Sequence, residues 1–163
     1  MLKRAALFLA LAGVVTSAAA KDSLGVFSGW GAFRDPSVPR CYAIAEAQPS
    51  ARDREFQPYT DIATWPARRI ERQVHFRLSR PMRPSGRITL RVGRKSFRLI
   101  GGKSDAWGAN PEMDAAIVDA MRRADEMTIY ATGTNGRRFS DSYALQGAAT
   151  AIDAAALACS PRR

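Results

Sequence analysis

The chain has 163 residues, of which 25 are lysine or arginine and 15 are aspartate or glutamate, so its formal net charge is +10 at pH 7. It contains one histidine and two cysteines. The usual zinc sites therefore lack a set of ligands, and we expect neither a metal nor another cofactor. Basic charge by itself does not indicate a nucleic-acid partner, because anionic lipids and acidic glycans attract the same surface.

The first twenty residues have the three parts of a secretory signal. Two basic residues precede an apolar run over 5–15, and Ala18 and Ala20 form a small-x-small cleavage pattern. The run is shorter than the roughly 20 residues that a membrane-spanning helix needs, and no later segment comes close. We therefore expect cleavage after Ala20, no transmembrane span, and a periplasmic or secreted protein with a single domain over 21–163. Its net charge would be +8, because two basic residues leave with the signal.

The first half of the predicted domain is rich in short strands. Residues 24–33 combine apolar side chains with three glycines, which is typical of an irregular or bulged strand. A second strand is predicted over 38–46, and alternating apolar residues predict a third over 71–80. Between them, prolines interrupt 47–69, so we expect a long surface loop with a short edge strand near 60–64.

The clearest hairpin follows, with apolar residues alternating over 88–92 and again over 97–99. The two-residue connection Gly93-Arg94 favours a type II′ turn, because glycine readily adopts the positive φ of its first position. Residues 101–108 contain three glycines around Trp107, so we expect a flexible connection there.

Two helices and a second hairpin complete the predicted fold. Asn110 caps a helix expected over 110–124, and an alanine-rich helix is expected over 148–159. Between them, Asn135-Gly136 favours a type I′ hairpin turn. The predicted class is α+β and β-rich: six or so antiparallel strands in a β-sandwich or partly closed barrel, covered by the two helices.

Export determines how Cys41 and Cys159 are interpreted, because two thiols in an oxidising compartment usually form a disulfide. Cys41 lies in a predicted strand and Cys159 in the last helix, 118 positions later. The chain-entropy model gives roughly 4–5 kcal/mol for closing such a loop, as an upper figure. Two separate buried thiols are the alternative. A redox-catalytic pair has no Cys-x-x-Cys motif to support it.

Catalytic constellations have little support in the sequence. His75 lies on the polar side of its strand, and a triad of His75, Ser140 and Asp141 has no Gly-x-Ser-x-Gly motif beside it. Carboxylate chemistry stays open, because four acids lie near glycine-rich turns: Asp105, Glu112, Asp114 and Asp141. The helix dipole alone, however, explains acids in a first helical turn.

The three tryptophans, Trp30, Trp65 and Trp107, each lie close to glycine or proline. Exposed indoles at strand ends and in loops would form an aromatic lip for a glycan. In a small β-rich domain, such side chains more often plug the open ends of the core, and this second interpretation is favoured.

Several motifs, taken in order, resemble the invasion-associated locus B family of exported α-proteobacterial proteins. They are Arg40-Cys41-Tyr42, Ser96-Phe97-Arg98-Leu99-Ile100, Trp107, Asp114 with 117–121, 133–136, 141–145, Gly147 and Cys159. The resemblance covers nearly the whole mature chain, and 141–159 is its most specific part. Family members have an additional cysteine shortly after the first tryptophan, which is absent here, so the resemblance is to a divergent member. It implies a periplasmic, secreted or envelope-associated β-rich domain, linked in some pathogens to host-cell entry, and supplies no catalytic residues.

Alternation along the central strands predicts a positive surface. If the apolar residues of 88–92 and 97–99 point inward, then Arg87, Arg91 and Arg98 point outward, and His75 and Arg77 do the same on their strand. Such a face would bind an anionic envelope component or another envelope protein. The other interpretation, which the sequence favours, is an ordinary solvated surface, because salt screens like charges.

Two classes of function are therefore compatible with the sequence. The first, which we favour, is an exported, non-enzymatic envelope-associated or interaction protein. The second is a hydrolase that acts on envelope polymers through paired carboxylates. A cleft that holds two acids about 5–9 Å apart would favour the hydrolase, and a filled core without one would favour the interaction protein.

Overall fold

The computed structural model describes residues 20–160, and the predicted signal sequence lies outside this part of the chain except for its last residue. The described strands are β1 (Asp22–Phe27), β2 (Trp30–Asp35), β3 (Arg40–Glu46), β4 (Tyr59–Trp65), β5 (Ile70–Arg77), β6 (Ile88–Val92), β7 (Lys95–Gly102), β8 (Asp105–Trp107), β9 (Glu126–Thr132) and β10 (Arg138–Ala144). The helices are α1 (Pro111–Met121), α2 (Ala148–Ala158) and the short 3₁₀ helix η1 (Pro66–Arg68).

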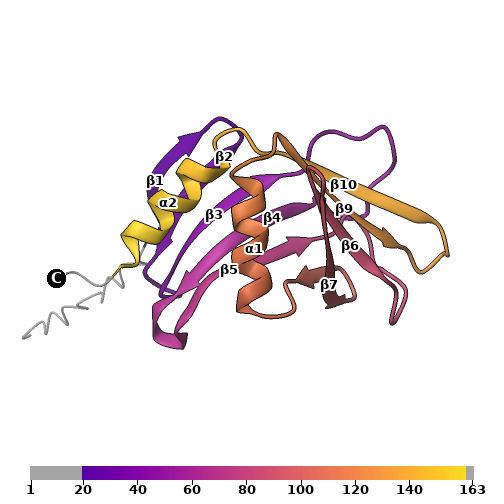
Figure 1. Ribbon diagram of the computed structural model, residues 1–163, viewed down its shortest axis with the longest axis horizontal. Helices are drawn as coiled ribbons and strands as arrows, with labels where there is room; N and C mark the ends of the chain where they lie inside the picture. The colour runs from indigo at the N-terminus through magenta and orange to yellow at the C-terminus, as the bar shows by residue number, and fades with distance from the viewer. Residues whose placement is uncertain (1–19, 161–163) are drawn as a thin grey trace, which may run out of the picture.

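The strands form one antiparallel sheet of ten, in the order β1-β2-β3-β4-β5-β8-β7-β6-β9-β10 (Figure 1). The sheet does not close, because β1 and β10 are its two edges and do not pair with each other. Its ends nevertheless approach, since the Trp30 indole donates a hydrogen bond of 2.9 Å to the carbonyl oxygen of Ala144. The prediction of a β-rich α+β fold with two helices is confirmed, although the sheet has more strands than expected.

Local sequence explains where both helices begin. The side chain of Asn110 accepts a hydrogen bond of 2.8 Å from the Met113 amide, and Pro111 occupies the first turn, where its missing amide hydrogen is not needed. At α2, Gly147 has a φ of 86°, and an added Cβ would lie 2.0 Å from the Phe27 carbonyl oxygen. Only glycine therefore fits at this junction between β10 and α2.

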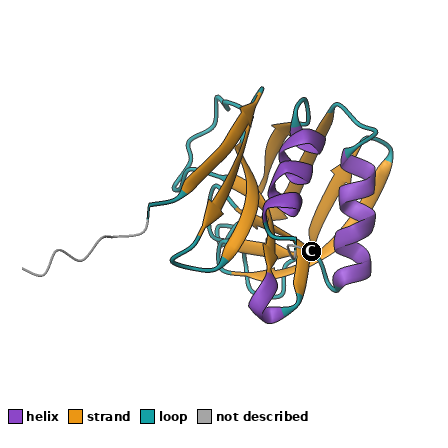
Figure 2. Cartoon of the chain, turned by 90° about the vertical axis from the view of Figure 1, so that its left-hand side faces the viewer, coloured by secondary structure: helices purple, strands orange, loops and turns teal. Residues whose placement is uncertain are grey.

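The two helices pack against the same side of the sheet (Figure 2). α2 covers β1, β2 and β3, whereas α1 packs mainly against β5. Arg122, just after α1, forms a salt bridge with Asp153 of α2. Apolar side chains from both halves of the sheet fill the space beneath the helices, including Phe76, Leu90 and Ile129. One continuous core therefore supports the whole sheet.

The disulfide between Cys41 and Cys159 is confirmed, with Cα atoms 5.8 Å apart. It joins β3 to the end of α2 and encloses 118 positions of the chain. Cys41 is fully buried. The bond therefore fastens the last helix to the strands that the helix covers.

Three predictions about strands were wrong. Two concern the first half of the chain, and the third concerns the connection that precedes α1. Residues 24–33 form a hairpin of β1 and β2, because Ser28 adopts a φ of 54° in the intervening turn. β4 is a central strand, paired with β3 on one side and β5 on the other, and not an edge strand. The glycine-rich connection over 101–108 contains β8, which pairs with β5 and β7. Glycines allow this close pairing, since a Cβ on Gly101 would lie 2.3 Å from the Asp105 carbonyl oxygen.

The two predicted hairpin turns had different outcomes. Gly93 has a φ of 54° while Arg94 does not have a positive φ, which fits the predicted type II′ turn. In the second hairpin only Gly136 has a positive φ, so the turn is not type I′. Asn135 instead accepts a hydrogen bond of 3.0 Å from the Arg137 amide. This side-chain contact fixes a longer loop that ends in a left-handed glycine.

Candidate functional site

The candidate site lies on the outer face of β6, β7, β9 and β10, opposite the core. Along β6, the buried residues Leu90 and Val92 alternate with Thr89 and Arg91, which point away from the core. The registers then place outward-facing side chains in rows across the strands. One row contains Arg98, Thr89, Tyr130 and Ser140, and the next contains Ser96, Arg91, Thr128 and Ser142.

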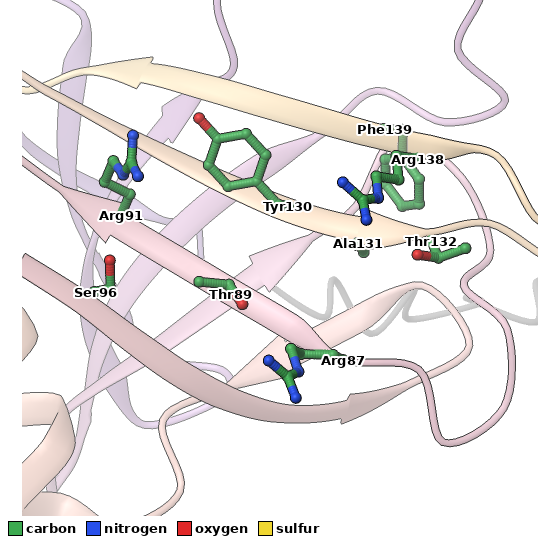
Figure 3. Close-up of a pocket in the computed structure, with 9 residues that line it drawn as sticks. All are labelled: Arg87, Thr89, Arg91, Ser96, Tyr130, Ala131, Thr132, Arg138 and Phe139. Atoms are coloured by element: carbon green, nitrogen blue, oxygen red, sulfur yellow. The ribbon is translucent and has the colours of Figure 1, made fainter.

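A groove of about 610 Å³ runs across this face (Figure 3). It is lined by Arg87, Thr89, Arg91, Ser96, Tyr130, Ala131, Thr132, Arg138 and Phe139, and we call it the arginine groove. Its three arginines are exposed, and none of them forms a salt bridge with another of residues 20–160. The groove is therefore a concave surface with uncompensated positive charge.

Tyr130 occupies the middle of the arginine groove. Figure 3 shows its ring between the guanidinium groups of Arg91 and Arg138. The residue is 43% exposed although it lies on a strand that is paired on both sides. Hydroxyl-bearing residues surround it, since Thr89 and Ser140 are its register partners and Thr132 also lines the groove. The groove thus combines an aromatic surface, hydrogen-bonding hydroxyls and three cationic side chains.

At one end of this face, the side chains form hydrogen bonds with one another. The Thr128 hydroxyl lies 2.8 Å from that of Ser142 and also donates a hydrogen bond of 3.3 Å to the Glu126 carboxylate. Glu126 is the acid that borders this end. The positive charge is therefore concentrated toward the other end, where Arg87 and Arg138 lie.

The predicted arginine face is divided in the structure. Arg87 and Arg91 lie in the arginine groove, and Arg98 is exposed on β7, opposite Thr89. His75 and Arg77 are on β5 and are both paired with carboxylates. Arg77 forms a salt bridge of 2.8 Å with Asp105, so this part of the face does not add uncompensated charge to the groove.

His75 lies between two carboxylates from neighbouring strands. Its Nδ1 is 2.7 Å from Asp61 of β4, and its Nε2 is 3.1 Å from Asp105 of β8. The imidazole also stacks on the Trp107 ring, with 5.3 Å between the ring centres. Burial lowers the pKa of His75, but the hydrogen bonds and charges of Asp61 and Asp105 outweigh this effect and raise the pKa above its ordinary value. We call these four residues the histidine cluster.

The structure does not assemble an aromatic lip. Trp30 is fully buried and faces the core, as the favoured interpretation of the tryptophans predicts. Trp65 lies at the end of β4 beneath the guanidinium groups of Arg40 and Arg68. Trp107 belongs to the histidine cluster. The three indoles therefore occupy different surroundings and do not form one binding surface.

The acids considered for catalysis are also separate. Asp105 binds His75 and Arg77, Asp114 is buried in the first turn of α1, and the Asp141 carboxylate accepts a hydrogen bond of 2.9 Å from the Ser79 amide. His75 is thus bonded to Asp61 and Asp105 and not to Asp141, which does not support the considered triad. Within residues 20–160, no group of three potential ligand side chains has an arrangement that could hold a metal ion.

Sequence reasoning missed Tyr130 and Arg138 as site residues. Both follow from alternation on the second hairpin, since Ile129, Ala131 and Phe139 are buried while Tyr130 and Arg138 are exposed. That signal was present in the sequence. The pairing of β6 with β9 was not, because these strands are separated by β7, β8 and α1 along the chain.

No family model, curated protein or solved structure matches the chain. Among the described residues, no helix is long and apolar enough to cross a membrane. The site must therefore be interpreted from its own geometry and charge.

Proposed function

We propose that this protein is an exported, non-enzymatic interaction module of the cell envelope, and that it binds an anionic partner through the arginine groove. The observation that carries the proposal is a concave surface where Arg87, Arg91 and Arg138 are exposed without salt bridges to other described residues. Arginine presents a planar set of donors that matches carboxylate and phosphate groups. A ligand with such groups would bring the charge that the groove lacks.

Two further observations support export and an envelope role. The disulfide between Cys41 and Cys159 is of the kind that persists in oxidising compartments. The order of motifs in the sequence resembles the invasion-associated locus B family, and this resemblance implies a periplasmic, secreted or envelope-associated β-rich domain. Both are consistent with the predicted secretory signal over 1–20.

The alternative, a hydrolase with paired carboxylates, has less support. Such an enzyme needs two acids that face each other across a substrate cleft. Asp61 and Asp105 are brought to a common partner, but that partner is His75, which lies between them and contacts one carboxylate with each ring nitrogen. Because both acids contact the same histidine, we interpret them as groups that hold neighbouring strands together and not as a pair of catalytic acids.

Cosedimentation of mature protein with native envelope fragments tests the proposed function. The groove variant Arg87→Glu with Arg91→Glu reverses two charges in the groove, so we expect it to lose binding that the wild type shows at low salt. The matched control is Arg52→Glu with Arg123→Glu, which makes the same change in net charge at exposed positions outside the groove. Equal cosedimentation of the groove variant and wild type, with both folded by circular dichroism, would refute the proposal.

A further inference from the structure

We infer that the ligand of the arginine groove is an acidic oligosaccharide, with one sugar ring packed against Tyr130 and its acidic groups bound by the surrounding arginines. This inference rests on the proposed function and specifies the chemical class of the partner. The observations that carry it are the position and exposure of Tyr130, the hydroxyls around it and the spacing of the arginines.

Tyr130 gives the groove an apolar surface that a purely electrostatic site does not need. The residue is 43% exposed between β6 and β10, and its register neighbours Thr89 and Ser140 have small side chains. A sugar ring has an apolar face of C–H groups and a rim of hydroxyls. Such a ring would cover the aromatic side chain and leave its hydroxyls near the polar neighbours.

The hydroxyl-bearing residues favour a ligand with many hydrogen-bonding groups. Thr89, Ser96 and Thr132 line the groove, and no hydrogen bond of their hydroxyls to another described residue is present in the structure. Each hydroxyl can donate one hydrogen bond and accept others. A glycan has enough hydroxyl groups to hydrogen-bond with all three residues, whereas a single inorganic anion would contact only some of them.

The arginines are spaced for an extended ligand. Arg87 and Arg91 are four residues apart along one extended segment, which corresponds to about 13 Å, and Arg138 lies two strands away, at about 10 Å. These are backbone spacings, and an extended ligand with acidic groups on separate sugar units fits them better than a single small anion does. Each guanidinium can hold a carboxylate, sulfate or phosphate by paired hydrogen bonds.

The groove fits a membrane surface less well. A peripheral membrane site usually presents protruding apolar side chains that enter the lipid beside its basic residues. Here Tyr130 is the only exposed large apolar side chain among the residues that line the groove, and it lies between arginines in a concave surface. An oligosaccharide can enter such a concave surface more easily than a flat bilayer can contact its floor.

The test is an NMR titration of ¹⁵N-labelled mature protein with two acidic probes, hexagalacturonate and a heparin-derived hexasaccharide. The methyl ester of hexagalacturonate serves as the neutral control. We expect at least one acidic probe to shift the amides of Thr89, Arg91, Tyr130, Thr132 and Arg138, and the ester to shift none of them. Tyr130→Ala should weaken binding by about tenfold, and Tyr130→Phe should restore most of it, because the ring is retained.

The outcomes separate the ligand class from the proposed function. Binding to phosphatidylglycerol vesicles through the same arginines, without binding of either acidic probe, would overturn the oligosaccharide and leave an anion-binding protein. Failure of both the oligosaccharides and the vesicles, together with unchanged cosedimentation of the groove variant, would overturn both proposals. Acidic probes that bind Tyr130→Ala as tightly as wild type would also overturn the inferred role of the ring.

Discussion

Asp114 shows how a single buried acid affects the stability of this fold. The residue lies in the first turn of α1 and is 6% exposed, and its Oδ1 accepts a hydrogen bond of 3.2 Å from the Val74 amide of β5. Burial raises its pKa from 3.8 to about 6, with the Val74 amide acting in the opposite direction. The folded protein therefore binds this proton more tightly than the unfolded chain. Its contribution to stability is full below pH 3.8 and is lost as pH rises to about 6.

Asp114→Asn should consequently stabilise the protein at neutral and alkaline pH. The amide oxygen can still accept the Val74 hydrogen bond, and the buried charge is removed. We expect the free energy of unfolding to rise by about 2–3 kcal/mol at pH 8 and by much less at pH 4, as the shift in pKa requires. Urea unfolding at both pH values measures the difference. A variant that is no more stable than wild type at pH 8 would contradict this assignment.

At the scale of elements, the histidine cluster connects three neighbouring strands. His75 of β5 bonds to Asp61 of β4 and to Asp105 of β8, and β8 is the three-residue strand that joins the two halves of the sheet. The raised pKa of His75 means that protonation stabilises the folded state. This contribution is fully present below pH 6.5 and is lost as pH rises through the higher pKa of the folded protein.

His75→Gln should therefore reduce the pH dependence of stability above pH 6.5. Glutamine can keep a hydrogen bond to one carboxylate but cannot carry the charge that both carboxylates favour. We expect the variant to be less stable than wild type at pH 6, with a smaller difference at pH 9. Thermal unfolding across this range provides the measurement. A constant difference at all pH values would show that His75 acts only through packing.

The disulfide also connects two elements, because it fastens the end of α2 to β3. Cys159→Ser removes a bond that encloses 118 positions, and the expected loss in the free energy of unfolding is about 2–5 kcal/mol. Chemical denaturation of the variant and wild type, both without reductant, measures this loss. Reduction of the wild type should produce a similar change, and equal stability of oxidised and reduced protein would count against the stabilising role.

Particular residues show how far the sequence could predict the whole molecule. Local signals were sufficient for α1, whose cap at Asn110 is read directly from the chain, and for the hairpin at Gly93. They were insufficient where tertiary pairing overrides local composition, as in β8, whose glycine-rich surroundings indicated a flexible connection. The arginine groove likewise has one feature that local sequence predicts and others that depend on tertiary pairing. Outward arginines were predictable, but the pairing of Arg77 with Asp105 and the approach of Arg138 depend on strand order.

The proposal that the protein is exported makes a separate prediction for the whole molecule. The small-residue pattern ends at Ala20, so the amino terminus of the exported protein should be Lys21. Intact-mass measurement of protein recovered from the periplasm or medium would identify this terminus. A full-length product retained in the membrane fraction would show that the segment acts as an anchor.

In the proposed function, the uncompensated arginines of the arginine groove bind an anionic partner. The most direct test of this binding uses whichever probe binds the wild type, hexagalacturonate or anionic vesicles. The affinity for that probe is measured over a range of salt concentrations. Affinity of wild type and of Arg52→Glu with Arg123→Glu should fall steeply and equally as salt rises, because ions screen the groove. Arg87→Glu with Arg91→Glu should bind weakly and show little salt dependence. The same affinity and salt slope for all three proteins would contradict the account.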